Sequence, residues 1–94
     1  MDWNEYPKRS QGMEISEVTD GFIVSHAESE RIHYLNATAA FLLEVCDGTI
    51  RADELPGLLA MAFSLEHSPD TDVEECLDAL SRQGLLVAID HVGA

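Results

Sequence analysis

The feature that most constrains the fold is an apolar stretch, residues 31–48, in which a strand pattern passes directly into a helix pattern. Residues 31–35 carry β-branched and aromatic side chains at alternate positions, which predicts a half-buried strand. Asn36 can accept a hydrogen bond from the first turn of a helix, and Gly48 can adopt the left-handed conformation that ends one. Apolar side chains surround nearly all of the intervening helix, so we expect it to form the centre of the core.

The length of 94 residues provides for one domain and no second core. A hydrophobic fraction of 46% is typical of a folded protein. No window is apolar for long enough to span a membrane, and the first residues lack the basic and apolar regions of a signal peptide. The sequence therefore predicts a cytoplasmic protein that does not bind a membrane.

The charge is strongly negative, with 18 acidic against 5 basic residues and a formal net charge of −13. Proteins bind nucleic-acid backbones through clustered Lys and Arg, and here Lys8 and Arg9 are the only adjacent basic pair. Nucleic-acid binding is therefore not expected. Two hypotheses explain the negative charge: it keeps a small protein soluble, or it attracts a basic partner.

The cysteines and histidines do not form a reactive or metal-binding pattern. Cys46 and Cys76 lie on expected apolar helix faces, where reduced cysteines commonly pack. Neither their spacing nor that of the four histidines matches a zinc site, so we expect no metal and no cofactor. A lone histidine on a strand, His33, is more often structural than catalytic, and the sequence predicts a protein that is not an enzyme.

The residues before this stretch predict a hairpin. Residues 1–12 are expected to form a flexible N-terminal arm. Residues 13–18 and 22–26 alternate in part and flank Asp20-Gly21, a pair that favours a type I′ turn. With the strand at 31–35 they predict a three-stranded antiparallel sheet.

The residues after the 31–48 stretch predict two more helices. The first covers about 52–65, or begins at Pro56 because proline lacks the N–H of a helix interior. The second covers 71–83, begins at a capping box formed by Thr71 and Glu74, and ends at Gly84. Leu85-Leu86-Val87 packs back or adds a short strand. The order β-β-β-α-α-α is that of an α+β domain over 13–87, followed by a C-terminal tail at 88–94.

Three motifs in this order give a specific resemblance. They are Leu35-Asn36-Ala37-Thr38-Ala39-Ala40, then Val45-Cys46-Asp47-Gly48, then Leu85-Leu86 after Gly84. Over about residues 13–87 the chain resembles the pyrroloquinoline quinone (PQQ) biosynthesis protein D family, the PqqD-like proteins. One departure is Arg51, which stands where family members commonly have a helix-capping Thr or Ser.

The resemblance implies a small winged-helix-like fold and a role as a recognition element for ribosomally synthesised, post-translationally modified peptides (RiPPs). Such a protein holds the leader region of a precursor peptide and presents it to a modifying enzyme, often a radical S-adenosylmethionine (radical SAM) enzyme. In the family the peptide lies between the third strand and the third helix.

The residues themselves are compatible with this placement, because the free edge of a small sheet can accept another chain as an added strand. One shoulder of the third helix carries the small side chains Cys76 and Ala79, which leave space for a side chain of the peptide. Asp72 lies on the same shoulder and could pair with a basic side chain of the peptide. The shoulder with Glu74 and Ser81 is the alternative. The predicted peptide-binding residues are Arg31, Ile32, His33, Tyr34, Leu35, Asp72, Val73, Cys76, Ala79, Leu80 and Gln83.

Two other functions compete with this prediction. A winged-helix regulator would bind DNA, although a third helix with Asp72, Glu74 and Glu75 has the wrong charge for phosphates. A small subunit could stabilise an enzyme through interface contacts alone. A homodimer also stays open, because an exposed strand edge pairs two copies as readily as it pairs a peptide.

Overall fold

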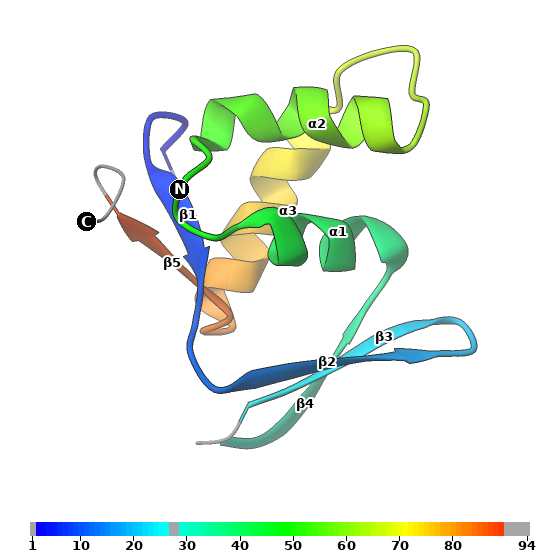
Figure 1. Ribbon diagram of the computed structural model, residues 1–94, viewed down its shortest axis with the longest axis vertical. Coiled ribbons are helices and arrows are strands. Elements are labelled where there is room, and N and C mark those ends of the chain that lie inside the picture. Colours follow the sequence, from blue (N-terminus) through cyan, green and yellow to red (C-terminus); the bar gives the residue numbers. More distant parts are fainter. Residues whose placement is uncertain (1, 27–28, 90–94) are drawn as a thin grey trace.

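The chain folds as an α+β domain with two antiparallel sheets (Figure 1). The computed structural model describes residues 2–26 and 29–89. The larger sheet has the order β2-β3-β4, and the smaller pairs β1 with β5. The strands are β1 (Tyr6–Arg9), β2 (Met13–Val18), β3 (Gly21–His26), β4 (Ser29–Leu35) and β5 (Leu86–Ile89). Three α-helices follow β4 and lie on one side of the larger sheet (Figure 1).

The predicted hairpin and three-stranded sheet are confirmed. Val18 pairs with Gly21, so the connection consists of Thr19 and Asp20, and Gly21 is already the first residue of β3. The turn therefore lies one residue earlier than the predicted Asp20-Gly21 pair. The core face of the sheet is marked by Val24, which is fully buried.

Helix α1 (Ala37–Val45) forms the centre of the core, as predicted. The backbone N–H of Ala39 donates to Oδ1 of Asn36 at 2.8 Å, so the predicted cap is present. Leu42 and Leu43 are fully buried. The helix ends at Val45, and Gly48 has the expected positive φ of 88° in the turn that follows.

The second helix begins as a 3₁₀ turn, η1 (Ala52–Glu54), which continues into α2 (Leu55–Ala62). The predicted start at about residue 52 coincides with the start of η1, and the alternative start at Pro56 lies one residue after the start of α2. Pro56 lies in the first turn of α2, where its missing N–H leaves no helical hydrogen bond unmade. The helix ends three residues before the predicted position, and Ser64 then takes a left-handed φ of 54°.

Helix α3 (Asp70–Arg82) has an inner stripe of Val73, Leu77 and Leu80, all buried. The predicted capping box is wrong. The helix begins one residue before Thr71, with Pro69 at the capping position and no side-chain cap. Thr71 is therefore already inside the first turn. Gly84, with φ of 78°, follows the last turn as predicted.

The N-terminal residues differ from the predicted flexible arm, because β1 pairs with β5. The backbone N–H groups of Arg9 and Ser10 donate to the carbonyls of Cys46 and Leu85, at 2.8 and 3.0 Å. Pro7 is buried. The sequence Tyr6-Pro7-Lys8-Arg9 shows no alternation of apolar and polar residues, and the partner strand lies at the far end of the sequence.

The same segment also completes the start of the second helix. The carbonyl of Glu5 accepts from the N–H of Ala52 at 2.8 Å, and that of Trp3 accepts from the N–H of Asp53 at 2.9 Å. These are backbone donors at a helix start, which lack partners inside the helix. Residues 2–10 are thus integral to the fold.

The expected C-terminal tail is also in part a strand, since β5 extends to Ile89. The rest of the predicted tail, with His91, lies outside the described residues. Within 2–26 and 29–89, no helix is long and apolar enough to cross a membrane.

Candidate functional site

Strand β4 is an edge of the larger sheet. It pairs with β3 on one side, and in the described part of the chain no strand pairs with its other side. Backbone N–H and C=O groups along such an edge are available to another chain. The residues of β4 that direct these groups outward are therefore the ones that could bind another chain.

The position of the Leu35 carbonyl shows which residues of β4 face outward. A Cβ atom on Gly21 of β3 would lie 2.7 Å from this oxygen, so the carbonyl of Leu35 faces β3. In an antiparallel pair the N–H and C=O of one residue face the same side, and the side alternates along the strand. His33 therefore also faces β3, whereas the N–H and C=O of Ile32 and Tyr34 face the free edge.

The side chains of β4 separate into two faces. Leu35 is 6% exposed and His33 is half-buried, and both lie on the core face with Val24. Ile32 and Tyr34 lie on the outer face, where they are 67% and 66% exposed. The predicted strand residues thus provide an open edge with two apolar side chains beside it.

The predicted residues of α3 also divide by burial. Val73 and Leu80 belong to the core, so their side chains are not available at the surface. Cys76 and Ala79 are half-buried, with Asp72 and Gln83 exposed beside them. The alternative shoulder is exposed at both Glu74 and Ser81. The small side chains therefore lie at the boundary between core and surface.

The structure does not join β4 and α3 in one of the described cavities. Helix α3 packs mainly on β5, α1 and α2. One hollow of about 270 Å³ lies where Lys8 and Arg9 approach Cys46 and Asp47. Another of about 520 Å³ lies over Ile50, Leu58 and Met61, beside Asp53 and Glu54. The sequence showed the Lys8-Arg9 pair and the apolar helix, but not the neighbours that the fold gives them.

Neither thiol of the chain is activated. Burial raises the pKa of Cys46 to about 12, and the neighbouring Cys76 adds to the effect. Burial also raises the pKa of Cys76. A nucleophilic cysteine needs the opposite shift, since the thiolate is the reactive form. Among the described residues, no group of three or more His, Cys, Asp or Glu side chains is placed to hold a metal ion.

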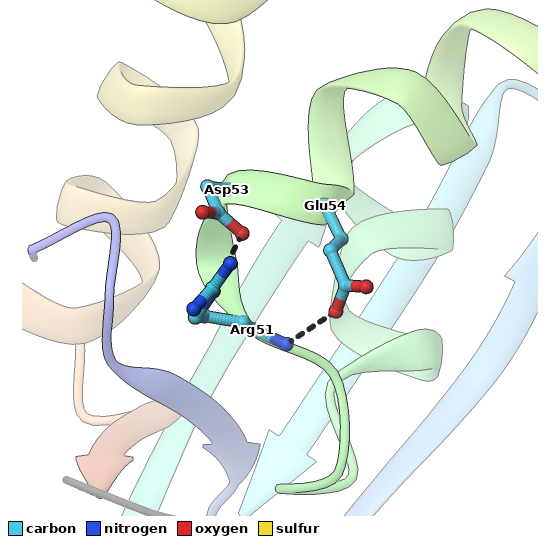
Figure 2. Close-up of polar contacts among 3 residues, drawn as sticks. All are labelled: Arg51, Asp53 and Glu54. Carbon is cyan, nitrogen blue, oxygen red and sulfur yellow. Dashed lines mark hydrogen bonds and ion pairs between the residues drawn. The ribbon is translucent and has the colours of Figure 1, made fainter.

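Arg51, the departure from the family pattern, still begins the second helix (Figure 2). Its backbone N–H donates to Oε2 of Glu54 at 3.0 Å, which is one half of a capping box. Its guanidinium Nε donates to Oδ1 of Asp53 at 2.9 Å. An arginine side chain cannot accept the second hydrogen bond of a capping box. The carbonyls of Trp3 and Glu5 accept from the helix start instead.

Residues 21–86 match the family described as Coenzyme PQQ synthesis protein D (PqqD). No curated protein and no solved structure matches the chain significantly. The matched region runs from the first residue of β3 to the first residue of β5, and so includes β4 and all the helices. With most of its length matched, the chain belongs to the PqqD family.

Proposed function

We propose that this chain is a non-catalytic adaptor that binds the leader region of a ribosomally synthesised precursor peptide and presents it to a modifying enzyme. The family is named for coenzyme PQQ synthesis, so PQQ or a related RiPP is the expected product of the pathway. The modifying enzyme is proposed to be a radical SAM enzyme. The peptide adds to β4 as a further strand.

The observation that carries this proposal is the free edge of β4. Ile32 and Tyr34 direct N–H and C=O groups away from β3, as the Leu35 carbonyl at Gly21 indicates. An added strand would form its main-chain hydrogen bonds with these two residues. Such bonds provide affinity for a backbone, whatever the side chains of the guest.

The flank of α3 with Cys76 and Ala79 supports a second contact. Half-buried small side chains leave room beside the core for a guest side chain, and the exposed Asp72 and Gln83 provide polar groups at the rim. A basic residue of the guest would be attracted to Asp72 and to the net charge of −13. We therefore propose this shoulder, and not that of Glu74 and Ser81, as the helical wall of the site.

A catalytic role receives no support from the reactive groups. The raised pKa values of Cys46 and Cys76 keep both thiols protonated at neutral pH. DNA binding is disfavoured as well, because Asp72, Glu74 and Glu75 are exposed on α3, the helix that would approach the phosphates.

Isothermal titration calorimetry and ¹⁵N NMR titration test the proposal. The probes are synthetic leader peptides from precursor genes that neighbour the gene for this chain. We expect saturable binding, with amide shifts concentrated in residues 31–35 and on the Asp72, Cys76 and Ala79 flank of α3. Shifts confined to the hairpin turn and α2 would refute the placement.

Proline substitution at the edge provides the matched control. Ile32→Pro removes an outward N–H and should abolish binding, while the sheet retains its bonds to β3. By the same alternation, the N–H of Glu17 faces outward on the opposite edge, β2, so Glu17→Pro should leave binding intact. Both variants are first compared with the parent by NMR to establish that they fold. Equal binding by all three proteins would exclude addition at β4.

A further inference from the structure

The outer face of the larger sheet differs in polarity between its two edge strands. Its side chains on β2 include Glu14 and Ser16, which are polar and exposed. Its side chains on β4 include Ile32 and Tyr34, which are apolar or aromatic and 67% and 66% exposed. The apolar side of this face therefore lies along the β4 edge.

This asymmetry distinguishes the two edges of the sheet. Charged and polar side chains on an edge strand discourage pairing with another chain, and β2 has them. At Ile32 and Tyr34, which direct their backbone outward, the outer face of β4 lacks such protection. The same residues, Ile32 and Tyr34, thus offer main-chain hydrogen bonds and uncovered apolar surface together.

We infer that the guest peptide is recognised on the outer face of the sheet as well as on the helical side, through two apolar or aromatic side chains at positions i and i+2 of the added strand. This inference rests on the proposed strand addition. Residues directly opposite one another on neighbouring strands have their Cβ atoms about 4.5–5.5 Å apart on the same face. The guest residues opposite Ile32 and Tyr34 therefore cover these side chains, and side chains two residues apart share that face.

Tyr34 already has one cross-strand neighbour within the sheet. Tyr34 lies opposite Ile23 of β3, which is half-buried, whereas the side of Tyr34 toward the free edge has no neighbouring strand in the described sheet. A β-branched or aromatic guest residue would give Tyr34 a second cross-strand partner. Pairs of aromatic and β-branched residues are among the favourable cross-strand pairs.

A second copy of this chain is the competing occupant. Two β4 edges related by a two-fold axis at His33 would place Ile32 opposite Tyr34 of the other copy. Such a dimer brings together two chains that each have a net charge of −13, which opposes association. A peptide, particularly a basic one, meets no such repulsion. The occupant that we propose is therefore a peptide strand.

The test uses a phage-displayed library of random linear peptides, selected on the immobilised protein. The enriched peptides should share apolar or aromatic residues at i and i+2. One enriched peptide is then synthesised and titrated by calorimetry against the parent, the double variant Ile32→Thr/Tyr34→Thr, and Val18→Thr. Threonine retains the backbone N–H and favours strands. Val18 lies on the outer face of β2, so its substitution is the matched control.

We expect the double variant to bind roughly two- to thirtyfold more weakly than the parent, from the loss of two cross-strand pairs, and Val18→Thr to bind as the parent does. The same peptide with Thr at i and i+2 should bind the parent more weakly by a similar factor. Its affinity for the double variant should differ little from that of the unmodified peptide.

The outcomes separate the two proposals. If Ile32→Pro abolishes binding of this peptide but the threonine double variant retains parental affinity, strand addition stands and outer-face recognition is refuted. If Ile32→Pro binds normally, or if the library yields no binder, strand addition itself fails. A parent that sediments as a dimer and a double variant that sediments as a monomer would show that a second copy covers this surface, which overturns the inference.

Discussion

A Cβ atom on Gly21 would lie 2.7 Å from the carbonyl oxygen of Leu35, closer than side chains and backbone approach in folded proteins. This contact lies where the edge strand of the candidate site meets the hairpin. We expect Gly21→Ala to destabilise the protein by about 1–3 kcal/mol, because one of the strands must shift. Urea unfolding followed by circular dichroism measures the change.

Gly57→Ala is the matched control for that substitution. Gly57 is exposed on α2, and no atom outside its own helix and chain neighbours lies within 4 Å of its Cβ position. Alanine in a helix should stabilise the protein by about 0.5–1 kcal/mol relative to glycine. A loss of stability in Gly57→Ala equal to that in Gly21→Ala would contradict the role of the Gly21 contact.

The cap of α1 gives a second prediction. Asn36→Ala removes the acceptor of the Ala39 N–H and should cost about 1 kcal/mol of the free energy of unfolding. Asn36→Asp keeps an acceptor oxygen at the same distance along the side chain and should cost little. Urea unfolding of both variants measures these changes. A similar loss of stability in Asn36→Asp and Asn36→Ala would show that the loss does not come from the missing cap.

Deletion of residues 1–5 should expose the start of the second helix. The N–H groups of Ala52 and Asp53 lose the carbonyls of Glu5 and Trp3, and Ala52 is 1% exposed. Each lost backbone hydrogen bond should cost about 0.5–1.5 kcal/mol of the free energy of unfolding. Hydrogen exchange should accelerate at these two amides in particular.

Deletion of residues 1–2 is the control for this truncation, because it retains both carbonyls. It should leave the protection of Ala52 and Asp53 unchanged. If the longer deletion left exchange at Ala52 unaltered, the N-terminal segment would not stabilise this helix.

The buried thiol of Cys46 predicts the alkaline limit of stability. Its pKa is raised from 9.0 to about 12 in the folded protein, so the folded state holds the proton more tightly than the unfolded chain. This contribution to stability is fully present below about pH 9 and is lost as the pH rises toward 12. Urea midpoints measured along this range should fall, and should fall less steeply in Cys46→Ala.

Alkylation provides an independent measure of the same thiols. At neutral pH both Cys46 and Cys76 should react with iodoacetamide far more slowly in the folded protein than in urea, because both pKa values are raised. Rapid reaction of Cys46 in the folded protein would mean that it is accessible and ionised, and would reopen a catalytic role.

The sequence predicted the central strand and helix well because local signals agree there. The apolar pattern, the Asn36 cap and Gly48 all favour the same helix, and packing then confirms it, with Leu42 and Leu43 fully buried. Local signals failed at α3, where Thr71 and Glu74 form a capping-box pattern but the helix already begins at Asp70.

The small sheet could not be predicted, because its two strands are short and lie at opposite ends of the sequence. The same limit applies to the candidate site. The alternation in residues 31–35 predicted a strand, but not which of its side chains are exposed. The outward faces of Ile32 and Tyr34 follow only from the register with β3 and from the approach of Leu35 to Gly21.

The pairing of β1 with β5 has a consequence for synthesis. On the ribosome, residues 6–9 leave the exit tunnel long before residues 86–89, which form the strand β5 that pairs with them. A nascent chain can therefore form its hairpin and helices early, but its second sheet closes only after translation has passed Ile89. Premature termination before that point would release a chain whose first strand retains its contacts with residues 46–48 but lacks its partner β5.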